Sequence, residues 1–273
     1  IYEEEFSVGN TRKSIKGIIA RVQLEEFSKG IILPHEFTLS KAKEDRLNLM
    51  KATNCNFSQI YALYMDEKHT TLATIDEQSK AKADLEFTDE TGVTHRLWIE
   101  TDEKIIAKLV ADFADRKLYI ADGHHRYETA LNYRNYCREN GISKPGDPQD
   151  FQMIYLVDME HPGLVVFPTH RLVRDLPNFD KEAVLEKCSE FFYIDEKEGT
   201  DTMEEDLKKL YDEGKKAFGF YCGKGEWFLL TLKNIDIMSQ MLPNVSKASQ
   251  SLDVSVLHTL ILEKIFGIDK ENM

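Results

Sequence analysis

The sequence predicts a mixed α+β protein in two parts, residues 1–148 and 149–273. Alternating, β-branched stretches such as 14–24 indicate strands, and apolar residues at helical spacing, as in 102–116, indicate amphipathic helices. Both kinds of pattern occur along the whole chain without an internal repeat, which is typical of a mixed fold. Residues 141–148, Gly-Ile-Ser-Lys-Pro-Gly-Asp-Pro, contain the highest density of helix and strand breakers, so we place the boundary there.

In the first part, the patterns predict strands, one extended segment, a hairpin and three helices. The strands are 14–24, 58–64 and 118–121, the extended segment is 31–34, and the hairpin pairs 85–87 with 94–99. The helices are 41–52 after an N-cap at Ser40, 102–116 capped by Thr101 or Asp102, and one from the turn at Gly123 to about Asn140.

In the second part, strands are expected at 151–159 and 164–167, joined by a turn at His161-Pro162-Gly163. A hairpin pairs 217–222 with 227–232 around glycines at 223 and 225. Helices are expected at 178–192, 201–214 and 254–266.

Composition limits the function classes. The 273 residues are 42% hydrophobic and 30% charged, as in a soluble globular protein. No apolar run approaches 18 residues, so we expect no membrane partner. The formal net charge of −13 argues against general nucleic-acid binding, which depends on Lys and Arg neutralising phosphates, but it allows a local basic pocket.

Two further features bear on the setting of the chain. The start, Ile1-Tyr2-Glu3-Glu4-Glu5, has neither an initiator Met nor a signal peptide, which suggests a piece of a longer protein. The four cysteines are widely spaced and form no CxxC pair, which argues against a zinc ribbon or a thioredoxin-type motif. We therefore expect a cytoplasmic protein. The sequence carries no signal for an oligomeric state.

The stretch 118–128 holds the most informative motif. An apolar strand is followed by Asp122-Gly123, and the next helix starts with His124, His125 and Arg126. The N-terminus of a helix favours anions, so cationic side chains there indicate that an anion such as phosphate is bound. The alternative is a solvated helix start with neutral histidines.

Three polar clusters each follow an apolar segment, where sites are commonly built. They are His35-Glu36, Asp122 to Arg126, and His170-Arg171. Arginines at the second and third clusters are suited to clamping phosphate oxygens bidentately. Asp122 or Glu36 is suited to accepting a proton from an attacking hydroxyl. The alternatives are a surface carboxylate for Glu36 and a strand-end ion pair for His170-Arg171.

Further candidates for phosphate binding are Gly123, His35 and Arg46, the last on a charged helix face that could also be merely solvated. Zinc is disfavoured because the adjacent His124 and His125 point about 100° apart on a helix. Magnesium, bound through Asp122 or Glu36 together with ligand phosphates, fits better. Walker A, GxGxxG, HExxH and GxSxG motifs do not occur.

The run Ala-Asp-Gly-His-His-Arg-Tyr-Glu-Thr-Ala, residues 121–130, resembles a bacterial and archaeal family catalogued as a domain of unknown function. The resemblance covers about residues 16–265. It extends to the segment 35–38, to Asp45-Arg46, to Trp98 and to the segment 168–171. The family's N-terminal extension and its Lys- and Tyr-rich C-terminal segment are not present here.

More remotely, Asp-Gly-His-His-Arg is similar to the nucleotide-binding motif of the ParB/sulfiredoxin superfamily, which includes partition proteins, sulfiredoxins and a kinase of free serine. The serine kinase shares the full string. The resemblance implies a ParB/sulfiredoxin-like first part, a catalytic or metal-linked Asp122, and phosphate binding by residues 123–126. Sulfiredoxin chemistry is disfavoured because histidines stand where it needs a cysteine.

Together these features predict a phosphotransferase. It would use ATP, ADP or pyrophosphate with Mg²⁺ to phosphorylate a small hydroxylated metabolite such as serine. Catalysis would depend on Asp122, Glu36 and His125, with the second part of the chain contributing to the same cleft. The alternatives are a non-catalytic nucleotide-binding regulator of the ParB type and, against the net charge, a DNA-binding regulator.

Overall fold

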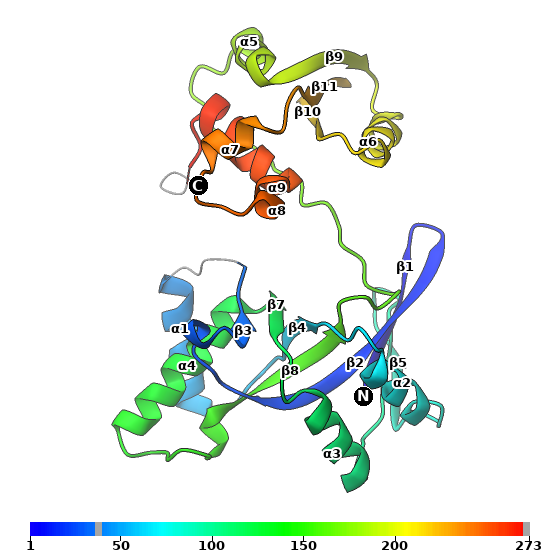
Figure 1. Ribbon diagram of the computed structural model, residues 1–273, viewed down its shortest axis with the longest axis vertical. Coiled ribbons are helices and arrows are strands. Elements are labelled where there is room, and N and C mark those ends of the chain that lie inside the picture. Colours follow the sequence, from blue (N-terminus) through cyan, green and yellow to red (C-terminus); the bar gives the residue numbers. More distant parts are fainter. Residues whose placement is uncertain (36–39, 270–273) are drawn as a thin grey trace. The chain divides into compact units, whose positions relative to one another are not determined.

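The computed structural model describes residues 1–35 and 40–269, and the chain divides into two compact units, Ile1–Pro168 and Thr169–Met273 (Figure 1). The fold is α+β with a mixed sheet, as predicted. The division lies about twenty residues after the predicted boundary at 148. It does so because strand β8 (Phe151–Asp158) pairs with strands of the first unit on both of its edges.

An eight-stranded sheet forms the centre of the first unit. Its order is β3 (Ile32–Leu33), β7 (Leu118–Asp122), β4 (Ile60–Tyr64), β8, β2 (Thr11–Gln23), β1 (Tyr2–Val8), β6 (Thr94–Leu97) and β5 (Leu85–Thr88). The pairs β3–β7 and β4–β8 are parallel and the other neighbours are antiparallel. The predicted strands at 14–24, 58–64 and 118–121 and the predicted hairpin are confirmed with small shifts at their ends.

The helices of this unit include all three that the sequence predicts. They are α1 (Ser40–Thr53), α2 (Thr70–Gln78), α3 (Glu103–Asp112) and α4 (His124–Glu139), with short 3₁₀ turns at Phe27–Lys29 and Pro148–Asp150. Asp102 caps α3 by accepting a hydrogen bond from the backbone N–H of Lys104. Helix α3 ends before the predicted Arg116, and α2 was not predicted because its sequence is largely polar.

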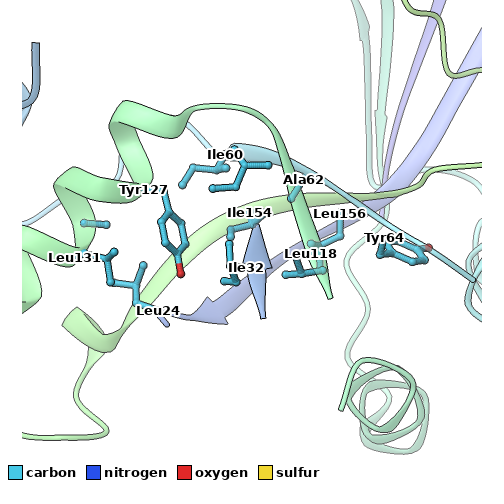
Figure 2. Close-up of a cluster of buried hydrophobic side chains, with 12 residues drawn as sticks. Leu24, Ile32, Ile60, Ala62, Tyr64, Leu118, Tyr127, Leu131, Ile154 and Leu156 are labelled. Atoms are coloured by element: carbon cyan, nitrogen blue, oxygen red, sulfur yellow. The ribbon is translucent and has the colours of Figure 1, made fainter. Parts of the chain in front are cut away.

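One face of the sheet packs under α4. Tyr127 of α4 belongs to one cluster with buried aliphatic side chains from several strands, among them Ile60, Ile154 and Leu118 (Figure 2). Tyr127 is fully buried, and its hydroxyl donates to the carbonyl of Glu25 at 2.8 Å. Burying a large side chain contributes roughly 1.5–3 kcal/mol, so this cluster fixes the position of α4 on the sheet.

The other face carries a second cluster, because successive side chains of a strand point to opposite faces. Along β8, Tyr155 and Val157 alternate with the residues that face α4. Ile15 from β2 packs in the same cluster. The rings of Tyr61 and Tyr155 stack with centroids 5.4 Å apart. This aromatic face is the floor on which the candidate site is built.

The segment 164–167 is not a strand, and that prediction is wrong. Strand β8 is flanked by β4 and β2, so the returning chain finds no free edge beside it. The chain turns at Gly163 and Leu164 packs on the aromatic face instead. The approach is close: a Cβ at Gly163 would lie 1.7 Å from the carbonyl oxygen of Ser14.

The second unit holds a three-stranded antiparallel sheet with helices. The strands, in the order β10, β11, β9, are Ala217–Gly223, Glu226–Leu232 and Phe192–Glu198; the helices are α5 (Lys181–Phe191), α6 (Met203–Asp212), α7 (Ile237–Met241), α8 (Lys247–Gln250) and α9 (Asp253–Val256). The predicted hairpin and the helices at 178–192 and 201–214 are confirmed. The last predicted helix is present, but from Leu257 to Phe266 it is a π-helix.

Phe192, Leu230, Met238 and Leu260 form the centre of the core of this unit. Among the helices of both units that the structure describes, none combines the length and the apolar character needed to cross a bilayer.

We predict that Gly163→Ala lowers the free energy of unfolding by about 1–3 kcal/mol, the usual cost of overpacking, because the new methyl group collides with the Ser14 carbonyl. Urea unfolding followed by tryptophan fluorescence measures the loss. Gly219→Ala is the matched control, since a Cβ there meets its neighbours at 3.5 Å or more. Equal stability of both variants would contradict the close approach at Gly163.

Candidate functional site

A glycine turn joins β7 to α4 at the predicted motif. Asp122 ends the strand, Gly123 adopts a left-handed conformation with φ 97° and ψ 26°, and His124 begins the 16-residue helix. In a left-handed conformation only glycine avoids a steric cost. The first N–H groups of a helix lack partners within it and, with the helix dipole, favour an anion. The expected strand, turn and helix start are therefore present.

Arg126 holds this turn together. Its Nη1 donates to the hydroxyl of Ser58 at 2.7 Å and to the carbonyl of Gln59 at 2.5 Å, and its Nη2 pairs with the carboxylate of Asp122. Ser58 and Gln59 precede β4, which runs antiparallel to β7. One guanidinium thus ties the start of β4 to the end of β7.

The guanidinium also lies directly over Gly123. A Cβ at Gly123 would come within 3.0 Å of two Arg126 nitrogens, Nε and Nη2. Asp122 keeps most of its side chain in solvent, with 73% exposed, while Arg126 is 27% exposed. An exposed ion pair adds little stability, so the notable property of Asp122 is that its carboxylate is accessible.

Two histidines contact each other where α4 begins. His124 is only 3% exposed, and its Nε2 accepts from the backbone N–H of His35 at 3.2 Å. The His35 ring lies perpendicular to that of His124 at 4.5 Å, with its Nδ1 2.8 Å from the carbonyl of Ile120. Since Nε2 of His124 accepts, a neutral ring carries its proton on Nδ1. The structure therefore brings His35 and His124 together beside β7, and their binding of phosphate stays a prediction.

Helix α1 packs against α4, the helix that begins at the motif. Lys43 on α1 pairs with Glu128 on α4 at 2.6 Å. Arg46, one turn further along α1, is exposed. His125 in the first turn of α4 is half-buried, and its carbonyl accepts from the hydroxyl of Thr129 at 2.6 Å. Arg46 and His125 thus belong to two helices that contact each other.

The remaining candidates stay predictions. Glu36 lies outside the residues that the structure describes. His170 and Arg171 belong to the second unit, where Arg171 donates to the carbonyl of Thr169 at 2.7 Å and lies 3.4 Å from Nε2 of His258.

A groove of about 380 Å³ opens beside the turn, within the first unit. Five polar residues line it: Asp122 and Arg126 from the motif, Ser58 and Gln59 from the start of β4, and Glu4 from β1. A groove of this size is in the range of small-molecule sites.

The apolar lining comes from the aromatic face and from the segment that returns along it. Ile15, Tyr61 and Tyr155 line the groove from the sheet, and Leu164 and Phe167 line it from the returning segment. Phe167 remains 63% exposed. A ligand here would meet charged groups and aromatic surface together.

The sequence did not reveal Glu4, Ser58 or Gln59 as site residues. Ser58 and Gln59 are placed by the antiparallel pairing of β4 with β7, which no local pattern encodes. Glu4 lies in a run of three glutamates that reads as a solvated segment. One local pattern bears on Glu4: in a strand, Tyr2, Glu4 and Phe6 lie two residues apart and therefore share one face.

Among the described residues, no three His, Cys, Asp or Glu side chains gather in a group that could hold a metal ion by themselves. Asp122 offers one accessible carboxylate. Magnesium is often held by one or two carboxylates together with ligand phosphates and water. The donor set at the turn fits that mode of binding.

A family model described as protein of unknown function (DUF1015) matches residues 1–255. No curated protein and no solved structure matches the chain.

We predict that Gly123→Ala destabilises the protein more than Gly141→Ala. Both glycines have positive φ, so each alanine incurs about 1–2 kcal/mol of left-handed strain, but only a Cβ at Gly123 meets a neighbour, the Arg126 guanidinium. Urea unfolding of the two variants measures the difference. Equal losses would show that the guanidinium does not constrain the turn.

We predict that His161 makes the stability of the protein depend on pH. Its ring accepts a hydrogen bond within the turn that precedes the groove-lining residues Leu164 and Phe167. Its Nδ1 accepts from the N–H of Gly163 at 3.0 Å, and burial lowers the pKa of the ring. The unfolded chain, with a His pKa of about 6.5, then takes up the proton more readily than the folded chain. The contribution of this ring to stability is therefore constant above that pH and is lost as the pH decreases below it.

The test compares the free energy of unfolding of the wild type and of His161→Gln between pH 7.5 and 5. The wild type should lose more stability over this interval than the variant, which has no titrating ring. Identical pH profiles would exclude this role of His161.

Proposed function

The chain belongs to the family described as protein of unknown function (DUF1015), and we propose that it is a phosphotransferase. It would transfer a phosphoryl group from a nucleotide or pyrophosphate to a small hydroxylated metabolite such as serine. One observation carries the proposal. An accessible carboxylate and a guanidinium, Asp122 and Arg126, line one groove at a glycine turn that opens the N-terminus of a long helix.

The turn supplies what a phosphate group requires. The N–H groups of the first turn, which have no acceptor within the helix itself, and the helix dipole at the start of α4 favour an anion. Arg126 is already positioned by Ser58 and Gln59, so little side-chain entropy is lost when its guanidinium binds phosphate oxygens. Arg46, on the neighbouring helix α1, is a further candidate for binding the phosphates.

Asp122 supplies the proton acceptor. Phosphoryl transfer needs mainly positioning and stabilisation of charge, and the protein adds a group that accepts the hydroxyl proton of the acceptor. Once a phosphate takes over part of the Arg126 guanidinium, the carboxylate is free to accept that proton. Glu36 is the second candidate for this role, and His125, in the first turn of α4, is the third residue that we propose for catalysis.

Magnesium would be held by Asp122 and by the phosphates of the donor, where it neutralises their charge. The resemblance of Asp-Gly-His-His-Arg to the ParB/sulfiredoxin superfamily, and in full to its kinase of free serine, supports the same reaction class. It supports a ParB/sulfiredoxin-like nucleotide site in the first unit as well.

We predict that the protein phosphorylates serine with at least one of ATP, ADP or pyrophosphate in the presence of Mg²⁺, as followed by ³¹P NMR. Asp122→Asn should lower the turnover by about 10²–10⁴-fold, the usual contribution of a general base, without lowering the unfolding midpoint by more than a few degrees.

Lys43→Gln serves as the control, because it removes a charge from the neighbouring α1–α4 contact and leaves the groove intact. Absence of turnover with every donor would refute the proposal. Binding of a nucleotide that stays unchanged would indicate a nucleotide-binding regulator instead.

A further inference from the structure

Strand β1 separates its acidic residues onto two faces. Glu3 and Glu5 point to one face, where both pair with Arg96, and Glu5 also pairs with Arg12. Glu4 points to the opposite face and lines the groove. The alternation of a strand thus neutralises two of the three carboxylates and presents the third to the site.

The surroundings of Glu4 are aromatic. The hydroxyl of Tyr2 donates to the carboxylate at 2.8 Å, and the Tyr2 ring lies edge-on to Tyr155 at 5.3 Å. Tyr155 in turn stacks on Tyr61. Burial, and after it the charge of Glu4, raises the pKa of Tyr61 to about 12 and that of Tyr155 further. The charge of Glu4 therefore acts on both tyrosines that line the groove.

Within the described residues the carboxylate of Glu4 pairs with no lysine or arginine, and its one ionisable basic neighbour is His95, at 3.9 Å. It is 37% exposed. A carboxylate at the edge of an apolar groove, without a fixed counter-ion, is suited to a cation. The faces of aromatic rings add attraction for the same charge.

We infer that Glu4, with Tyr61, Tyr155 and Phe6, forms a subsite for a primary ammonium group of the acceptor. This inference rests on the proposed function and adds the substrate class: hydroxylated amines are preferred over neutral or purely acidic hydroxyl compounds. Among the charged groups that line the groove, Arg126 would then bind phosphate and Glu4 would bind ammonium. Such a pattern orients the acceptor hydroxyl towards the donor.

The test uses serine and glycerate, which differ only in the exchange of the ammonium group for a hydroxyl. For the wild-type chain, KM for serine should be at least about tenfold lower than KM for glycerate. Glu4→Gln should raise KM for serine about tenfold, as expected when a charge-assisted contact is lost, and should leave kcat, KM for glycerate and KM for the donor unchanged.

Two further variants control for folding and net charge. Glu4→Asp keeps the carboxylate and should retain most of the preference for serine. Glu3→Gln removes one charge from the same strand on the opposite face and should leave KM for serine unchanged. The inference would be overturned if Glu4→Gln changed KM for serine and KM for glycerate by the same factor. It would also be overturned if Glu4→Gln left KM for serine unchanged, as is expected of Glu3→Gln.

Equilibrium binding of serine and of glycerate, titrated by NMR without a donor, separates this inference from the proposed function. Binding that prefers serine and depends on Glu4, without any turnover, would refute the phosphotransferase and support the subsite. Turnover without such a preference would support the phosphotransferase and refute the subsite. Absence of both would refute both.

Discussion

The contact of the Arg126 guanidinium with the Gly123 turn is the constraint on which the site depends. The guanidinium donates to the hydroxyl of Ser58, the carbonyl of Gln59 and the carboxylate of Asp122. Two of its nitrogens lie 3.0 Å from the position that a Cβ of residue 123 would take. It thereby fixes the end of β7, the start of β4 and the first turn of α4 at one point. Glycine at position 123 is needed both for its backbone conformation and for this space.

Much of the first unit could be predicted from local patterns. The apolar run at 118–121, the glycine after Asp122 and the helical spacing beyond it define β7, the turn and α4 within a residue or two. The cap at Asp102 and the hairpin that pairs 85–87 with 94–99 could also be predicted, because capping and turn residues act through their immediate neighbours.

The groove could not be predicted in the same way, because tertiary pairing creates it. Glu4 reaches the site through the pairing of β1 with β2, and Ser58 through the pairing of β4 with β7. The segment 164–167 has the composition of a strand, yet both edges of β8 are occupied, so it lies on the sheet face. Which edges are free is a property of the whole sheet and is invisible in any short window of sequence.

The order of the strands has a consequence for the synthesis of the protein. The groove takes residues from Glu4 near the start of the first unit and from Phe167 near its end. A chain still emerging from the ribosome therefore has no groove until nearly the whole first unit has been made. Formation of the groove also depends on contacts between segments that are distant in the sequence, and such contacts form slowly. A ligand of the groove would accordingly stabilise only completed first units and would give no help to shorter nascent chains.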